Sequence, residues 1–109
     1  MKKVEAVIQV GKLDEVREAL LRVGVSGLTI SEVMAAGEEE LTKLYRGSEY
    51  VVDLVRKVKI EALLDDAKAA QVVEAIRKSA RTGRLGDGDV FVVPIDDVVR
   101  IRTGERGAA

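Results

Sequence analysis

The sequence predicts an α+β fold in which two helices cover one face of a small antiparallel sheet. Its hydrophobic pattern switches between a period of two and a helical period, in the order strand, helix, strand, long loop, strand, helix, strand. The second half also echoes the first, because residues 3–6 and 15–20 resemble residues 57–62 and 71–76. A doubled half-unit of this kind builds a ferredoxin-like βαββαβ sandwich, which is the fold we expect.

The first half contains a strand, a helix and a second strand. Residues 4–10 carry apolar side chains at every second position, which predicts a strand. From Lys12 to Val23 the period changes to that of a helix, and Gly24 is placed to end it. The apolar face of this helix is formed by Leu13, Val16, Leu20 and Val23. A second strand is expected from Leu28 to Ala35.

The second half repeats this order after a long loop. Residues 57–64 read as a strand, and Asp65 and Asp66 are placed to cap the helix that follows. The core positions of this helix are Ala69, Val72, Val73, Ile76 and Ala80. A glycine-rich loop leads to residues 90–93 and to a final predicted strand, Val98–Arg102.

The strands carry apolar residues on both faces of the predicted sheet. Val7, for example, opposes the side formed by Val4, Ala6 and Ile8. A ferredoxin-like fold covers only one face with helices, so the other face needs a different cover. We therefore expect another copy of the chain to bury it in a homo-oligomer.

Composition excludes several classes of protein. The 109 residues suit one domain, and charged residues make up 34% of the chain yet nearly cancel, to a net charge of -1. A neutral balance with 3% aromatic residues argues against a nucleic-acid partner. The chain has no cysteine and no histidine, and no general base or activated nucleophile is visible, so we do not expect an enzyme. Without a leader or a long apolar run, we expect a cytoplasmic protein with no direct membrane insertion.

The loop from Thr82 to Gly88 is the strongest functional signal. Its three glycines leave main-chain N–H groups free to approach and surround a phosphate. Arg100 and Arg102 would project from one face of the predicted last strand, so both guanidinium groups could reach one anion. These features predict a small ligand that carries phosphate, although a Gly/Asp loop can also be a plain connection.

The stretch from Gly37 to Asp53 is long for so small a domain and has no clear periodicity. It holds a run of three glutamates, residues 38–40, and the two tyrosines of the chain, Tyr45 and Tyr50. One interpretation is a solvated acidic tip on a hairpin extension. The other is a recognition arm that changes shape with ligand.

Several of these segments together resemble the PII signal-transduction family. The matching motifs are residues 11–16, 27–30, 45–50, 80–88 and 99–105. The resemblance covers nearly the whole chain as a single domain, residues 1–109, with a T-loop at about 37–53, a B-loop at about 82–89 and a C-terminal segment at about 95–109. It implies a homotrimer that binds adenine nucleotides in the clefts between subunits. The T-loop would then regulate a partner protein such as a membrane transporter or an enzyme.

The resemblance also implies roles for individual residues. Thr29 and the backbone near Glu61 and Leu63 would hold adenine, and the B-loop and two arginines would hold phosphate, with Mg²⁺ as a companion of the nucleotide. The full set of implied nucleotide-binding residues is Thr29, Gly37, Glu61, Leu63, Thr82, Gly86, Asp87, Gly88, Arg100 and Arg102. The implied effector and T-loop residues are Glu39, Lys57, Tyr45 and Tyr50. Tyr50 matches a tyrosine that some bacterial members have uridylylated, and Lys57 matches the lysine that pairs with 2-oxoglutarate.

The chain departs from the family pattern at positions expected to contact the charged phosphates of the nucleotide. Asp89 stands where the family has a lysine, Glu38 replaces an arginine, and Glu39 aligns with a glutamine. Near the start, Gln9-Val10-Gly11 replaces Lys-Pro-Phe. Fewer positive groups should weaken ATP most, because ATP carries the most negative charge. We therefore predict a sensor that favours ADP or AMP over ATP.

Two other functions remain open. One is an ordinary nitrogen regulator that senses ATP and 2-oxoglutarate. The other is a trimer of the same fold that binds a divalent cation, for which residues 38–40 offer hard oxygen ligands. Nucleotide binding separates these alternatives.

Overall fold

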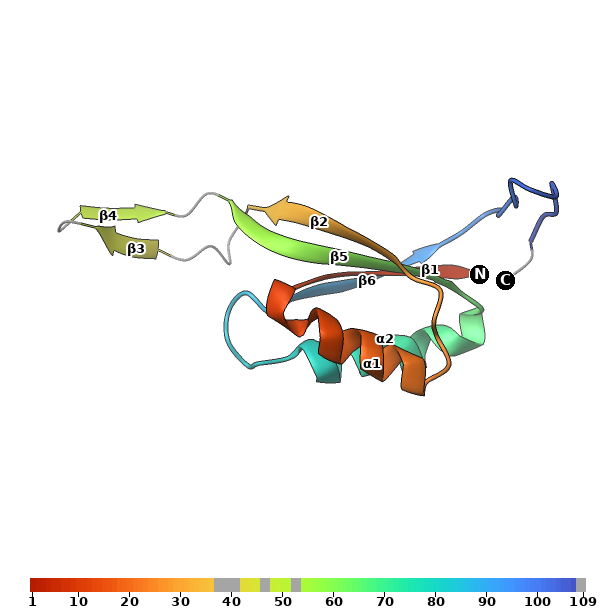
Figure 1. The fold of residues 1–109 in the computed structure, drawn as a ribbon, viewed down its shortest axis with the longest axis horizontal. Coiled ribbons are helices and arrows are strands. Elements are labelled where there is room, and N and C mark those ends of the chain that lie inside the picture. Colours follow the sequence, from red (N-terminus) through yellow and green to blue (C-terminus); the bar gives the residue numbers. More distant parts are fainter. Residues whose placement is uncertain (37–41, 46–47, 52–53, 108–109) are drawn as a thin grey trace.

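The computed structural model describes residues 1–36, 42–45, 48–51 and 54–107, and it confirms the α+β ferredoxin-like prediction. Both helices lie on one face of a four-stranded antiparallel sheet of order β2-β5-β1-β6 (Figure 1). The elements are β1 (Lys2–Ile8), a 3-10 turn (Val10–Lys12), α1 (Leu13–Arg22), β2 (Thr29–Ala35), β3 (Thr42–Tyr45), β4 (Ser48–Val51), β5 (Val55–Leu64), α2 (Asp66–Ala80) and β6 (Gly88–Pro94).

The core lies between the sheet and the two helices. Alternation along β1 and β5 turns every second side chain toward the helices, as the sequence pattern predicts. The most completely buried large side chains are Val4, Ile8, Val16, Leu20, Ile60, Val72 and Ile76. Each such side chain contributes roughly 1.5–3 kcal/mol by leaving water.

The first strand ends earlier than expected. β1 stops at Ile8, whereas the alternation continues to Val10. The amide of Lys12 donates to the carbonyl of Gln9 at 3.0 Å, and this turn leads the chain directly into α1. Gly24 ends α1 as predicted, with a φ of 85° that suits glycine.

The start of α2 also differs in detail from the prediction. Asp65 occupies the N-cap position, but its side chain makes no capping hydrogen bond. Asp66 binds the amino group of Met1 at 2.8 Å instead, and this hydrogen bond lowers the pKa of its carboxyl group. Asp65 therefore provides no side-chain cap, and Asp66 joins the amino terminus of the chain to α2.

The predicted last strand, Val98–Arg102, is wrong. After β6 the chain forms a hook, residues 95–107, which contains an isolated β-bridge between Val99 and Arg106. Within it the Gly104 amide donates to the Arg100 carbonyl at 2.8 Å, and the Arg100 amide donates to Glu105 at 2.9 Å. An alternating pattern becomes a strand only beside a partner backbone, and local turn bonds replace that partner here.

Part of the long loop forms a hairpin. β3 and β4 pair as a separate two-stranded sheet that extends beyond the ends of β2 and β5 (Figure 1). Tyr45 lies in β3 and Tyr50 lies in β4. Gly37 and residues 38–40 lie outside the described residues.

The sheet face opposite the helices is more polar than the strand pattern suggested. Lys3 pairs with Glu61 at 3.2 Å, and Lys59 pairs with Glu5 at 3.3 Å. These four side chains are between 22% and 33% exposed, so they form a half-buried charged cluster. Phe91, the neighbour of Glu5 on β6, is 50% exposed beside it. The open face is thus mixed rather than uniformly apolar.

Candidate functional site

The B-loop is closed from within by one carboxylate. Asp87 accepts hydrogen bonds from the amides of Thr82, at 2.8 Å, and Gly83, at 2.9 Å, and from the Thr82 hydroxyl. The hydroxyl and amide of Thr82 lower the pKa of the Asp87 carboxyl group, because they stabilise its ionised form. The Asp87 side chain therefore stabilises the conformation of the loop. A ligand would be bound by main-chain groups of the loop rather than by this carboxylate.

Glycine is required at two B-loop positions for different reasons. Gly86 has a φ of 92°, which suits glycine, but space is open around it apart from the ends of the Lys57 and Gln9 side chains. Gly88 has a φ of 99°, and a Cβ there would lie 1.8 Å from the carbonyl oxygen of Val7. Gly88 thus allows β6 to approach β1 closely where the B-loop joins the sheet.

Two side chains, one from β5 and one from the segment that follows β1, reach the middle of the B-loop. Lys57 on β5 donates its Nζ to the carbonyl of Gly86, and Gln9 donates its Nε2 to the same oxygen at 3.3 Å. Lys57 is only 8% exposed. The resemblance to the PII family implied an effector role for Lys57 and none for Gln9, because nothing in a linear sequence shows that these residues meet Gly86.

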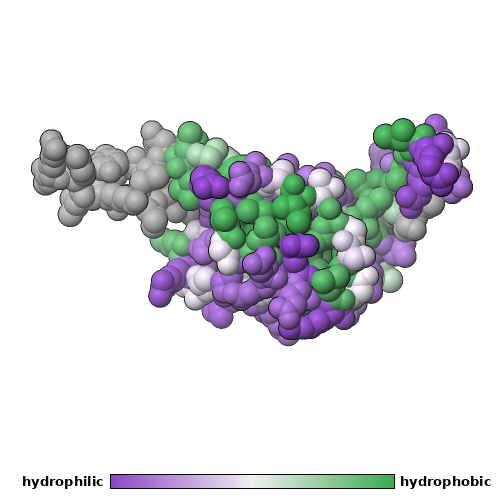
Figure 2. Space-filling view, viewed as in Figure 1, coloured by the Kyte–Doolittle hydropathy of each residue, from purple (hydrophilic) through white to green (hydrophobic). Residues whose placement is uncertain are grey.

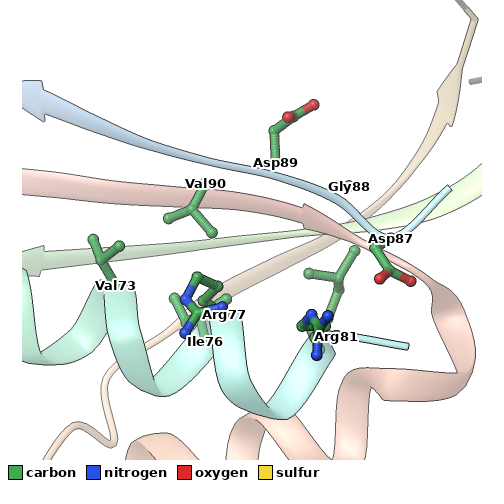
Figure 3. A pocket seen from close by; sticks show the side chains of 10 residues that line it. Val73, Ile76, Arg77, Arg81, Asp87, Gly88, Asp89 and Val90 are labelled. Carbon is green, nitrogen blue, oxygen red and sulfur yellow. The ribbon is translucent and has the colours of Figure 1, made fainter. Parts of the chain in front are cut away.

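A hollow of about 440 Å³ lies between α2 and β6, beside the B-loop (Figure 3). Its apolar walls include Val73, Ile76 and Val90. Arg77 and Arg81 stand along its helical side, whereas the Asp89 side chain points to the opposite side of β6 (Figure 3). Of the predicted site residues, Asp87 and Gly88 line this hollow. Arg77 is held by Glu74 at 2.7 Å, which raises the pKa of its guanidinium group.

The predicted adenine residues lie on the sheet rather than in this hollow. Thr29 and Glu61 are direct cross-strand partners, and Leu63 is the partner of Lys3. Glu61 pairs with Glu5 on β1, and Glu5 pairs with Phe91 on β6, so these residues form one row across the sheet. Phe91 lies three residues along β6 from Gly88. At about 3.3 Å per residue, this row lies about 10 Å from the end of the B-loop.

Arg100 and Arg102 do not meet the B-loop within one subunit. The B-loop enters β6 at Gly88, and the hook leaves β6 after Pro94, at the other end of the strand (Figure 1). Seven residues of β6 separate them by about 20 Å. The expectation that both arginines share one strand face is also wrong, because residues 101–103 form a turn.

Three acidic residues depart from the PII pattern, and Asp89 is the one that lies among the described residues. It is exposed, it follows Gly88 directly, and its strand partner is Val7. Its carboxylate therefore stands next to the B-loop on the open side of the sheet.

In residues 1–36, 42–45, 48–51 and 54–107, no three acidic side chains gather as metal ligands. None of the described helices is long and apolar enough to cross a membrane.

Comparison with known proteins places the chain in a family. The family model described as "Nitrogen regulatory protein P-II" matches residues 1–105. Proteins of that name are 54% identical in Azospirillum brasilense and 55% identical in Rhizobium meliloti, each over 108 residues, covering 98% of this chain and 96% of the relative. The protein of the same name from Synechocystis is 50% identical over 107 residues, covering 97% of this chain and 96% of its own. Proteins of this family are regulators that bind adenine nucleotides and act on partner proteins, generally as trimers. With matches of this extent and identity, the chain belongs to the nitrogen regulatory protein P-II family.

Proposed function

We propose that this chain is a P-II regulator that binds adenine nucleotide in clefts between the subunits of a homotrimer and acts on a partner protein through its T-loop. The main support for the proposal is the set of hydrogen bonds within the B-loop. Because the Asp87 carboxylate closes the loop onto Thr82 and Gly83, a phosphate meets a loop that is already ordered. The amides of Thr82, Gly83 and Arg84 are bound within the loop, so the main-chain N–H groups that follow them are the ones that can donate to a phosphate.

The separation of the B-loop from Arg100 and Arg102 supports a site that two subunits share. One subunit holds these two parts at opposite ends of β6, so both can face one ligand only if a second copy supplies one of them. The hook has an apolar side chain to contribute to such a contact, since Ile101 is fully exposed.

The edge of the sheet supports the same assembly. Among the described strands, β2 has one neighbour, β5, so its outer side is an edge of the sheet. Ile30 and Met34 on this strand are 41% and 55% exposed. Figure 2 shows apolar side chains gathered over this side of the sheet, above a largely hydrophilic helical surface. A second copy of the chain would remove this apolar surface from water.

Charge beside the B-loop supports a preference for ADP or AMP over ATP. Asp89 places a carboxylate where the family pattern has a lysine. At a separation of about 6 Å, each unit of phosphate charge would be repelled by about 1–3 kcal/mol, depending on how far water screens the pair. ATP carries the most charge and so loses the most affinity.

Calorimetric titration of the full chain with AMP, ADP and Mg-ATP tests this function. We expect ADP or AMP to bind more tightly than Mg-ATP, and Asp89→Lys to reverse the order. Mg-ATP as the tightest ligand of the natural chain, with affinity raised by 2-oxoglutarate, would favour the ordinary nitrogen regulator. Absence of any nucleotide binding would leave the divalent-cation alternative, which depends on residues 38–40.

A further inference from the structure

Two donors from distant parts of the chain converge on the carbonyl oxygen of Gly86. Gln9 lies between β1 and the 3-10 turn, and Lys57 lies near the start of β5. Both side chains donate to this oxygen, Gln9 from 3.3 Å. Gln9 is half-buried and Lys57 is buried, so neither hydrogen bond is fully exposed to solvent.

These bonds fix the orientation of one peptide unit. A trans peptide is planar, and its C=O and N–H groups point in opposite directions. When Gln9 and Lys57 hold the Gly86 carbonyl, the N–H of Asp87 faces away from them. The Asp87 carboxylate is meanwhile bound to Thr82 and Gly83, so the loop is fixed on both sides of this N–H group.

We propose that Gln9 is a positioning residue that orients the Gly86–Asp87 peptide so that its N–H can donate to phosphate. This inference rests on the proposed function, in which the B-loop binds the phosphates of a nucleotide. Gln9 differs from Lys57 in one important respect. The Lys57 ammonium is charged and can leave the carbonyl for an anionic ligand, whereas the neutral Gln9 amide is attracted to an anion much less strongly. Gln9 therefore keeps the loop oriented while Lys57 is engaged elsewhere.

The variant Gln9→Met tests the inference, because it keeps the length of the side chain and removes only the donor. Gln71→Met is the matched control, since Gln71 is exposed on α2. We expect Gln9→Met to weaken ADP binding about threefold to tenfold, the range that one net hydrogen bond supports. Adenosine, which lacks phosphate, should bind both variants and the natural chain equally well. Equal losses for ADP and adenosine would overturn the inference, because they indicate a general structural defect.

A second readout needs no ligand. The NMR chemical shifts of the Gly86 carbonyl carbon and the Asp87 amide in the free protein should change in Gln9→Met and stay unchanged in Gln71→Met. Unchanged shifts together with unchanged ADP affinity in Gln9→Met would overturn the inference. If the natural chain binds no nucleotide, the proposed function fails, and with it the phosphate role of Gln9. The chemical-shift measurement would then still decide whether Gln9 orients the loop.

Discussion

Replacing Gly88 by alanine should destabilise this protein far more than replacing another glycine of the same loop. A Cβ at position 88 would lie 1.8 Å from the carbonyl oxygen and 2.9 Å from the carbonyl carbon of Val7. Both are backbone atoms of β1, so neither can rotate away as a side chain would. The φ of 99° adds a conformational cost for any residue with a side chain. We expect about 1–3 kcal/mol for the backbone conformation and about another 1–3 kcal/mol for moving β6 from β1.

Gly83→Ala is the matched control. Gly83 also has a positive φ, of 85°, but the nearest atom to its Cβ would be the far end of Arg81 at 3.9 Å. Only the conformational cost of about 1–3 kcal/mol applies there. Urea unfolding at one fixed protein concentration measures both variants, because the stability of an oligomer depends on concentration. A loss in Gly88→Ala no larger than that in Gly83→Ala would refute the claim that β1 and β6 require glycine at this contact.

Three further predictions follow from the site and its surroundings. The pKa of Asp87 is lowered in the folded protein, so its carboxylate holds the B-loop fully above the ordinary carboxyl pKa and releases it as the pH falls through the lowered pKa. The NMR chemical shift of the Thr82 amide should report this release, and Asp87→Asn should abolish the transition. Asp89→Lys should strengthen Mg-ATP binding about tenfold or more and change adenosine binding little, which calorimetry can measure, whereas equal gains for both ligands would contradict a charge effect. Ile101→Asp should shift the protein toward smaller species in sedimentation if the exposed hook contacts another copy, and an unchanged distribution would count against that contact.

The sequence contained most of the information needed to predict the fold. Alternation in residues 4–8 and 57–64, and helical spacing from Val16 to Leu20 and from Val72 to Ile76, each predicted a buried face that the structure has. These patterns are reliable because they reflect burial against a neighbouring layer. Residues 98–102 show the same alternation, yet within one subunit they lie beside no partner strand and form a hook. A pattern in one chain cannot show which strand edges it will meet.

The candidate site was predictable in part. The glycines of residues 82–88 indicated a loop, and the structure has a loop there, although the amides of Thr82, Gly83 and Arg84 are bound within it. The use of the Asp87 carboxylate within the loop was not predictable, because the same residue could equally have faced a ligand. The contact of Gln9 and Lys57 with Gly86 joins three segments that are distant in sequence, so it emerges only from the packed structure.

Mixed trimers would test the central claim, a nucleotide site shared between subunits, most directly. One variant, Asp87→Ala, has a damaged B-loop, and the other, Arg100→Ala with Arg102→Ala, has a damaged hook. Each variant alone should bind ADP weakly, but trimers refolded from both should regain a fraction of sites with the affinity of the natural chain. That gain is predicted because an intact B-loop and an intact hook then meet in some clefts. If mixing restores no sites although both variants assemble together, both parts come from the same subunit and the shared site is contradicted.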